Sequence, residues 1–364
     1  MNEASRLRAL RGKMTEHEID GLLVKHLPDV RYLCGFTGSN AALIVTPEKA
    51  VLFTDGRYTA QARQETQGAR VVIAKKSAAM ETCALLETLI GKRGHAAYDP
   101  GYTTISELAL MRSAISGGRR RGFFRPLEKP LVSELRMIKD ADELKRMAEA
   151  AALGNRIFNA VLPHIQSGVP ESEIAAGLEF FARSMGAEGM SFETIVASGP
   201  RSAFPHGRAS SHKTPRNGFV TLDFGVILKG YCSDMTRTVC IGKPGVAERS
   251  AYDAVLEAQQ AAVAAVRPGV TCGEVDDAAR GTLRRAGLAK YFTHSTGHGV
   301  GLEIHESPRI GAGQTLELKP GMVITIEPGI YMPGKFGIRI EDMVAVTERG
   351  GKVLTPVTKA LIEL

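Results

Sequence analysis

The residues that could do chemistry centre on one short stretch, 294–306, which reads HSTGHGVGLEIHE. It holds three histidines among small and apolar residues: His294, His298 and His305. Four acidic residues elsewhere in the chain are candidates to face this stretch: Asp223, Asp234, Glu327 and Glu341. One imidazole and four carboxylates together could hold divalent metal ions and activate water for hydrolysis.

The first acidic pair lies in a predicted β-hairpin, residues 218–242, in which two strand-like runs flank a tight turn. A turn centred near Leu228 and Lys229 would place Asp223 directly opposite Asp234, with Cβ atoms about 4.5–5.5 Å apart. Aspartate is depleted in strand interiors, and two buried like charges are costly unless a cation separates them. The alternative is a pair of solvent-facing aspartates on an edge hairpin.

The end of the chain repeats this arrangement in a second predicted hairpin, residues 321–346. Two apolar runs flank a Pro- and Gly-containing turn, and Glu327 and Glu341 are symmetric about Gly334. Arg339 precedes Glu341 by two residues and should therefore share its face of the strand.

The elements that must position these residues follow from apolar periodicity. Two helices are predicted before the first hairpin, over 132–165 (with Asp140 or Asp142 as N-cap) and 171–186, and two between the hairpins, over 247–266 and 272–286. The order of two helices and an acidic hairpin thus occurs twice. It suggests two related halves that contribute acids to one centre.

The first third of the chain alternates short apolar runs with helical patterns and turn residues, which predicts an α/β domain. A helix is expected over 3–18, strands over 21–24, 30–33, 41–45, 50–53 and 71–74, and helices over 58–67 and 79–92. Two prolines at 126–130 interrupt regular structure. We place a domain boundary there, between an N-terminal domain (1–130) and a second domain (131–364).

The composition is that of a globular protein, with 44% hydrophobic and 23% charged residues among 364. No apolar run approaches the roughly 20 residues of a membrane span, and the N-terminus lacks the apolar core of a signal peptide. Five scattered cysteines without a CxxC pattern favour free thiols in a reducing cytosol, and hence a cytoplasmic location.

The net charge is +7, and three consecutive arginines within 117–125 contribute to it. Such a run is either a patch for acidic partners or a solvated turn. No nucleic-acid-binding motif accompanies it, so we predict neither a nucleic-acid nor a membrane partner.

The ligand set is rich in oxygen, has one nitrogen and contains no thiolate, which suits Mn²⁺, with Co²⁺ and Zn²⁺ as alternatives. The negative charge of four carboxylates exceeds the positive charge of one divalent ion. Two ions about 3.5–4 Å apart would balance it, and a water molecule between them would become the nucleophile.

Several motifs resemble the signature of proline peptidases, the aminopeptidase P and prolidase branch of the pita-bread metallopeptidases. They are the stretch 294–306, LDFG (222–225), YCSDMTRT (231–238), EPGIY (327–331) and GIRIED (337–342). The first third is similar more loosely, through FTGSNA (37–42) and TDGRY (54–58). The resemblance implies an α/β creatinase-like N-terminal domain and an α+β pita-bread (creatinase/aminopeptidase) domain with pseudo-twofold halves.

The resemblance also implies roles for individual residues. The five metal ligands would be Asp223, Asp234, His298, Glu327 and Glu341. Glu327 would also take the proton of the attacking water. His206 and His305 would hold the substrate and stabilise the oxyanion, as donors do where charge develops. The substrate pocket would further include His294, Arg339 and Tyr331, although His294 has a purely structural alternative.

Within this family, the N-terminal domain and the arginine of GIRIED favour a proline-directed enzyme over a methionine aminopeptidase. Prolidases tend to carry an arginine in the loop before EPG that grips the dipeptide carboxylate. Here Arg309 is the sole arginine of 307–322 and lies early, beside His305. We therefore favour an Xaa-Pro aminopeptidase acting on peptides with proline second, with an Xaa-Pro dipeptidase as the alternative. A non-catalytic binding protein is less favoured because all five ligands are present. The family resemblance further implies a homodimer.

Overall fold

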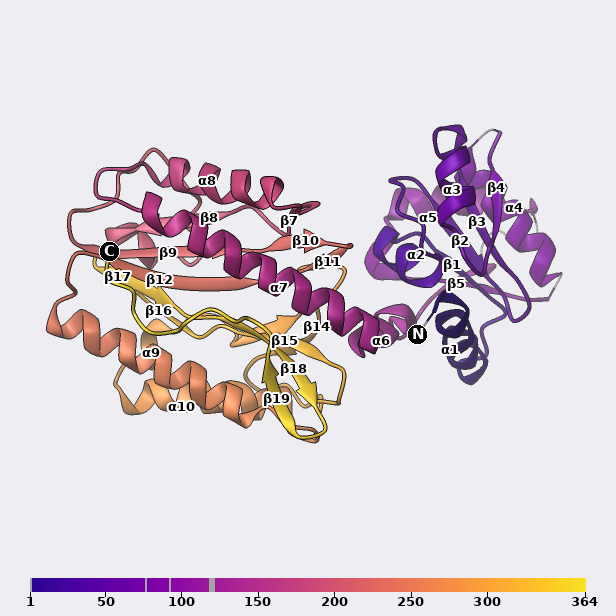
Figure 1. Ribbon diagram of the computed structural model, residues 1–364. Helices are drawn as coiled ribbons and strands as arrows, with labels where there is room; N and C mark the ends of the chain where they lie inside the picture. Colours follow the sequence, from indigo (N-terminus) through magenta and orange to yellow (C-terminus); the bar gives the residue numbers. More distant parts are fainter. Residues whose placement is uncertain (1, 76, 92, 118–121) are drawn as a thin grey trace. The chain divides into compact units, whose positions relative to one another are not determined.

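The computed structural model describes residues 2–75, 77–91, 93–117 and 122–364. The chain forms two compact units, Met1–Arg136 and Met137–Leu364 (Figure 1). The domain boundary that we place near residue 130, on the basis of the two prolines, stays a prediction. The predicted basic turn lies partly outside the described residues. The part left out, residues 118–121, includes all three consecutive arginines.

The N-terminal unit is an α/β domain around one sheet of strand order β4-β3-β2-β1-β5-β6. Strand β1 runs antiparallel to β2 and parallel to β5. The strands of this sheet are β1 (Gly21–Val24), β2 (Ala42–Val45), β3 (Ala50–Thr54), β4 (Arg70–Ile73), β5 (Ala96–Tyr98) and β6 (Phe124–Pro126). Its helices are α1 (Glu3–Glu16), α2 (Leu27–Cys34), α3 (Thr59–Glu65), α4 (Ala78–Ile90) and α5 (Ile105–Ser113), and α6 (Leu131–Met137) crosses the unit boundary.

The strand predicted over 30–33 is wrong, since these residues belong to helix α2. A proline at the first turn of α2 and Gly35 at its C-cap, with φ 82°, set its two ends. The apolar residues Val30, Leu33 and Cys34 then fall on one buried helix face. A four-residue apolar run does not by itself distinguish this spacing from a strand.

The C-terminal unit contains two helix pairs and four antiparallel sheets, with strand orders β11-β10-β7, β12-β9-β8, β14-β13-β15-β18-β19 and β16-β17. Its helices are α7 (Ala141–Val161), α8 (Glu171–Ser184), α9 (Val246–Ala265) and α10 (Cys272–Arg285). The helix predicted over 132–165 is interrupted before Asp140, which caps α7 by accepting from the backbone N–H groups of Asp142 and Glu143. In the view of Figure 1, α8 borders the strands above and α9 and α10 border them below.

The first half of this unit uses strands β7 (Gly189–Met190), β8 (Ile195–Ser198), β9 (Gly218–Phe224), β10 (Val226–Leu228), β11 (Tyr231–Cys232) and β12 (Met235–Ile241). The second half uses β13 (Gly297–Gly299), β14 (Glu306–Ile310), β15 (Val323–Ile326), β16 (Gly329–Met332), β17 (Phe336–Arg339), β18 (Asp342–Thr347) and β19 (Gly350–Val353). Each half folds a long hairpin that is interrupted close to its acidic residues, at Gly225 and 233–234 in the first half and at 327–328 and 340–341 in the second. This repetition gives the unit its pseudo-twofold organisation.

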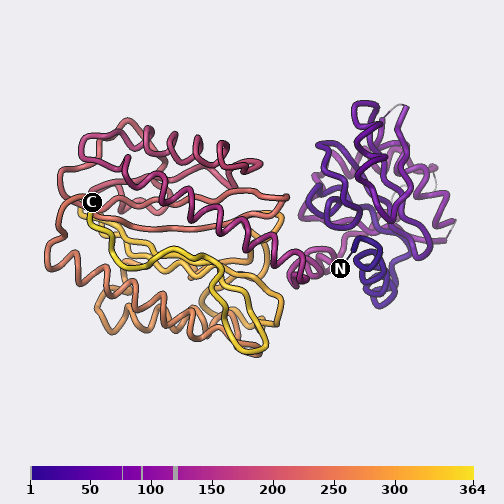
Figure 2. The backbone as a smooth tube through the Cα atoms, viewed as in Figure 1, coloured from indigo at the N-terminus to yellow at the C-terminus, as the bar shows by residue number. Residues whose placement is uncertain are grey.

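Each half has its own apolar core. Helices α7 and α8 pack on β8, β9 and β12, with Phe158, Leu178 and Leu222 at the centre. Helices α9 and α10 pack on β15 and β18, with Val255, Leu283 and Ile324 at the centre. The chain ends beside the first half, where Leu364 N donates to Cys240 O at 2.8 Å (Figure 2).

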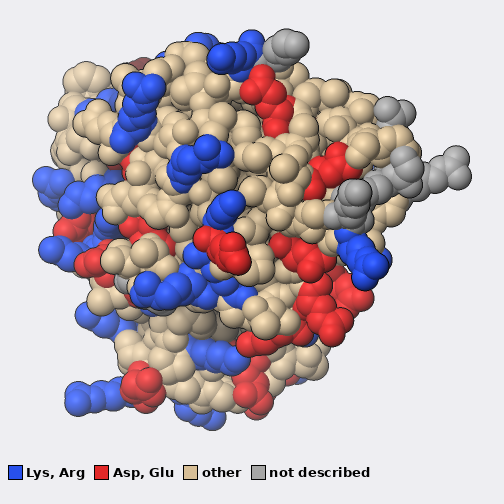
Figure 3. Space-filling model, turned by 90° about the vertical axis from the view of Figure 1, so that its right-hand side faces the viewer, with Lys and Arg blue, Asp and Glu red and all other residues tan. Residues whose placement is uncertain are grey.

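Surface charge is mixed on the face drawn in Figure 3, where lysine and arginine side chains are interspersed with aspartate and glutamate. None of the described helices combines the length and apolar character that a membrane span needs.

Candidate metal and substrate site

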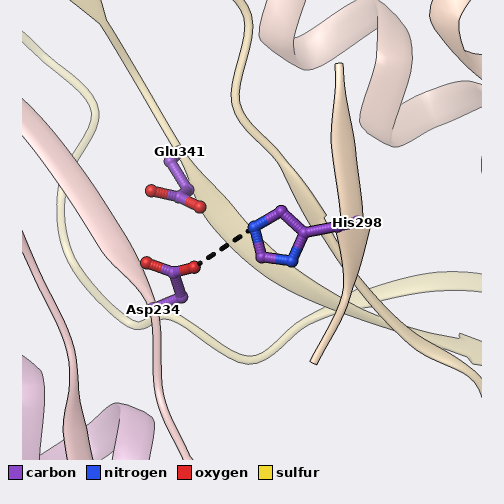
Figure 4. A group of neighbouring side chains, drawn as sticks. All are labelled: Asp234, His298 and Glu341. Carbon is purple, nitrogen blue, oxygen red and sulfur yellow. Dashed lines mark ion pairs between the residues drawn. The ribbon is translucent and has the colours of Figure 1, made fainter. Parts of the chain in front are cut away.

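Three of the predicted ligands converge in the C-terminal unit. Ligand atoms of Asp234, His298 and Glu341 all lie within 4.8 Å of one another (Figure 4). Asp234 lies just before β12, His298 is the middle residue of β13, and Glu341 lies just before β18. The cluster therefore takes one residue from the first half and two from the second.

The first hairpin reaches this cluster in a different register from the one predicted. Its turn is Lys229–Gly230, with φ 50° and 79°, and Leu228 pairs with Tyr231. Asp223 therefore lies opposite Thr236 and not opposite Asp234. Two consecutive left-handed residues suit the turn of a two-residue hairpin. Because Asp234 and Thr236 differ by two, Asp234 stays on the same face as Asp223, as a diagonal neighbour.

The second hairpin keeps the symmetry seen in the sequence. Ile326 pairs with Asp342 on one side of the acids, and Gly329 pairs with Arg339 on the other. These pairs place Glu327 opposite Glu341. At both acids the backbone N–H group bonds to a segment outside the hairpin. Glu327 N donates to Thr296 O, and Glu341 N donates to Thr236 O.

The remaining aspartate, Asp223, is tied to the second half by Arg339. The guanidinium Nη2 lies 2.5 Å from Asp223 Oδ2, and both side chains are largely buried. The other oxygen, Asp223 Oδ1, is buried and has no hydrogen-bond partner among the described residues. An unsatisfied buried carboxylate oxygen is costly, and a cation at this position would satisfy it.

His298 is oriented as a metal-binding histidine requires. Its Nδ1 lies 2.9 Å from Gly299 O, a contact that puts the ring proton on Nδ1 and leaves the Nε2 lone pair free. Nε2 lies 3.6 Å from Asp234 Oδ2 and 3.5 Å from Glu327 Oε1. Burial lowers the pKa of His298 to about 4, so that the ring is neutral at pH 7.

The acids are held in an environment that disfavours their negative charge. Burial, followed by the neighbouring carboxylates, raises the pKa values of Asp234 and Glu341 well above their usual range. Burial raises the pKa of Glu327 to about 8. Three such groups around one imidazole Nε2 are the donor set of a divalent cation with oxygen preference. The residues therefore fit the metals that the sequence implies.

The predicted substrate residues surround this cluster. The rings of His305 and His298 meet edge to face, with centroids 4.4 Å apart. Tyr331 Oη lies 2.9 Å from His294 Nε2 and accepts from Arg339 Nη1 at 2.6 Å.

His206 is exposed and follows Pro205, whose carbonyl accepts from Arg339 Nη1 at 3.1 Å. Burial lowers the pKa of His294 to about 4, and the nearby Arg339 and, to a smaller extent, His206 shift it in the same direction. The loop that carries His206 therefore lies beside the histidines of the second half.

Two hydroxyl groups that the sequence reading missed orient the acids. Thr236 Oγ1 donates to Glu341 Oε2 at 2.7 Å. Thr325 Oγ1 donates to Glu327 Oε1 at 3.3 Å and accepts from His298 N. Each threonine stands two residues from an acid of its own hairpin, so the strand period of two could have identified both.

Two buried carboxylates, also missed, anchor the loops around the site. In α10, Asp276 accepts from Thr296 Oγ1 at 2.7 Å and from Arg280 Nε at 2.7 Å. Glu171, the first residue of α8, accepts from Ser198 N, Arg201 Nε and Ser210 Oγ, and so bonds to both sides of the loop that carries His206. Helix periodicity alone does not reveal these tertiary contacts.

Comparison with known proteins agrees with this geometry. Residues 145–348 match the model of metallopeptidase family M24, and residues 6–138 match the creatinase/prolidase N-terminal domain. An Xaa-Pro dipeptidase from Pyrococcus furiosus is 37% identical over 98% of this chain and 99% of that protein.

Solved structures give the same picture. An Xaa-Pro dipeptidase from Bacillus anthracis is 39% identical, with 100% of both chains covered and a TM-score of 0.95. An X-Pro aminopeptidase from Thermotoga maritima is 36% identical, with 96% of this chain and 99% of that one covered and a TM-score of 0.88. The chain therefore belongs to metallopeptidase family M24, among the proline peptidases with the pita-bread fold.

Proposed function

We propose that the protein is an Xaa-Pro dipeptidase, which hydrolyses the bond before the proline of a dipeptide. This reverses the preference for an aminopeptidase drawn from the position of Arg309 in the sequence. The observation that carries the proposal is the place of Arg309 in the fold, and the similarity to Xaa-Pro dipeptidases supports it.

Arg309 lies early in its loop, but strand pairing brings it back to the site. On β14 it pairs directly with His298 of β13, and opposed residues of antiparallel strands project to the same face. Its side chain is exposed. A guanidinium on the face of the metal ligand suits a dipeptide whose terminal carboxylate is only a few ångströms from the scissile bond.

The metal ions would be held by Asp223, Asp234, His298, Glu327 and Glu341, with Mn²⁺ preferred because the set is rich in oxygen. When bound, two such ions supply Lewis-acid stabilisation and lower the pKa of a water molecule. Glu327, which lies opposite Glu341, would accept the proton of the attacking water.

The other residues bind and orient the substrate. His206 and His305, both exposed, would donate to the oxygen on which negative charge develops. The bond before proline has no N–H, so the departing amine must receive a proton, and Glu327 could return the one it took. His294, Tyr331 and Arg339 form the hydrogen-bonded wall beside these groups.

The test is hydrolysis of Ala-Pro and Ala-Pro-Ala by protein that has been stripped of metal and resupplied with Mn²⁺. We expect cleavage of the dipeptide with little cleavage of the tripeptide. Arg309→Met should raise KM for Ala-Pro by about 10–100-fold, as expected for loss of a charged contact of roughly 1.5–3 kcal/mol. Arg284→Met, which removes an exposed arginine of α10, is the matched control.

The second candidate is the Xaa-Pro aminopeptidase, which the similarity to the T. maritima enzyme favours. Efficient cleavage of Ala-Pro-Ala, unaffected by Arg309→Met, would establish that function in place of the dipeptidase.

We further infer a homodimer in the cytoplasm. All five cysteines are free and buried, which supports a reducing compartment. Sedimentation that detects only monomer at micromolar concentration would exclude the dimer.

A further inference from the structure

A buried ion pair outside the metal cluster joins the start of the C-terminal unit to the strand that carries Arg309. Lys139 Nζ lies 3.2 Å from Glu306 Oε2, and the two side chains are 1% and 6% exposed. Lys139 precedes the N-cap residue of α7, and Glu306 is the first residue of β14. We name this pair the Lys139–Glu306 clamp.

Glu306 lies at an irregular point of strand pairing. It pairs with Gly299, whereas the next pair joins His298 to Arg309, so two extra residues, Ser307 and Pro308, bulge out between them. Bulges re-aim side chains near active sites. This one determines the separation of Arg309 from His305, which immediately precedes Glu306.

The carboxylate of Glu306 also organises the turn before His305. Its Oε1 accepts from Glu303 N at 3.1 Å. A Cβ on Gly301 would lie 2.6 Å from Oε2, so the turn leaves no space for a side chain there. The turn 301–305 is therefore folded around this one carboxylate.

Lys139 is itself held by the backbone. Its N–H donates to Gly321 O at 2.8 Å, and Gly321 N donates to Val346 O at 2.9 Å. The ammonium group thus projects from a segment that is tied to strand β18 through Gly321. It is a rigid anchor for Glu306.

A buried ion pair is a poor device for stability alone, because desolvation of both charges offsets their attraction, and apolar replacements are often as stable. A directional contact at a bulge does, however, specify geometry. We infer that Lys139 and Glu306 are positioning residues, which keep His305 and Arg309 at the separation that fits a dipeptide. The specificity part of this inference rests on the proposed dipeptidase function.

The experiment compares two double variants of the full-length, Mn²⁺-loaded protein. Lys139→Met/Glu306→Gln removes both charges but keeps an oxygen that can accept from Glu303 N. The control, Arg136→Met/Asp29→Asn, removes a buried ion pair of the N-terminal unit, with Nη1–Oδ1 at 2.6 Å and both side chains 4% exposed.

For the clamp variant we expect KM for Ala-Pro to rise at least about tenfold and kcat to change less than about threefold, the pattern of lost substrate binding. The preference for Ala-Pro over Ala-Pro-Ala should fall by about the same factor, while the bound Mn²⁺ stays constant. The conservative single variant Glu306→Gln, which can still accept from Lys139, should retain most of the preference. The control should match wild type in KM, kcat, preference and bound Mn²⁺.

An unchanged KM and preference in the clamp variant would overturn the inference, and so would an equal change in the control. Failure of the dipeptidase proposal is recognised separately, from wild-type cleavage of the tripeptide alone. In that case the KM of the clamp variant for Ala-Pro-Ala still decides whether the pair positions His305.

Discussion

The two acidic hairpins of the C-terminal unit perform one task in two ways. In the first, Asp223 and Asp234 are diagonal neighbours, because Asp223 pairs with Thr236. In the second, Glu327 lies opposite Glu341, as the flanking pairs require. The first hairpin thus uses the shorter acid on a diagonal, and the second uses the longer acid in direct opposition.

The hairpins also hold each other's acids. Arg339 of the second hairpin binds Asp223 of the first, and Thr236 of the first donates to Glu341 of the second. Each hairpin thus supplies a hydrogen bond to a carboxylate of the other. The site therefore belongs to the interface between the two halves, and neither hairpin should support it alone.

The largest effect should come from neutralising one acid of each hairpin. Asp234→Asn and Glu341→Gln should each lower kcat/KM by more than about 100-fold. This loss exceeds the one that typically follows when a metal ligand only loses its hydrogen-bond partner. Both variants should also lose bound Mn²⁺, as measured by mass spectrometry of the metal. Asp277→Asn, exposed on α10, is the control. Full activity in either variant would mean that one hairpin suffices.

The next largest effect should come from substituting Arg237, a buried arginine that joins the two hairpins behind the acids. Arg237 Nη2 lies 2.7 Å from Asp342 Oδ1, and Nη1 also donates to Glu341 O. Arg237→Met should lower the free energy of unfolding by about 3–5 kcal/mol, because several buried acceptors lose a charged donor at once. The carboxylate of Asp342 keeps its second cationic partner, Lys359, but the carbonyls of Glu341 and Val357 lose the guanidinium.

The control for this prediction is Arg249→Met, which breaks the exposed pair of Arg249 with Glu363 and should cost at most about 1 kcal/mol. Urea denaturation measures both variants. Equal losses would mean that the contact between the hairpins does not depend on Arg237.

Metal removal should destabilise the protein increasingly as the pH rises. The pKa of Glu327 is raised to about 8 in the folded chain, against about 4.3 when unfolded. Between these values the folded state binds more protons, so the free energy of unfolding falls with rising pH. Bound metal removes this penalty, and at 100 times its Kd it adds about 2.7 kcal/mol.

The difference in Tm between Mn²⁺-loaded and stripped protein should therefore grow from about pH 5 to about pH 8, within the interval between the two pKa values. In the stripped protein, Glu327→Gln should weaken this dependence, and the raised pKa values of Asp234 and Glu341 should account for the part that remains. A constant difference across the range would contradict the prediction.

The smallest effect should come from the threonine hydroxyls. Thr236→Val removes the donor to Glu341, and Thr325→Val removes the donor to Glu327. Each should weaken Mn²⁺ affinity by about 10–100-fold, as the loss of a ligand's hydrogen-bond partner typically does. Thr282→Val, whose hydroxyl bonds within α10, should leave affinity unchanged. If Thr236→Val has no effect, the tie between the hairpins lies elsewhere.

Much of the fold could be predicted because it depends on local patterns. The amphipathic spacing of α8, α9 and α10 and the alternation in the long hairpins are properties of short windows. The α/β N-terminal domain and the pseudo-twofold unit followed from these elements and their order. Helix α2 was missed because its apolar run is too short for its period to be read.

For the site, the sequence by itself determined which acids and histidines are available and which of them share a strand face. The period of two places Arg339 with Glu341 in any register. It also keeps Asp223 and Asp234 on one face, even though the predicted turn was one residue off.

Only the tertiary structure decided the rest. The turn at Lys229–Gly230 set the register of the first hairpin, and a bulge returned Arg309 to His298. The bonds between Arg339 and Asp223 and between Thr236 and Glu341 join residues more than a hundred positions apart. Such contacts depend on how the two halves pack, which a local pattern does not encode.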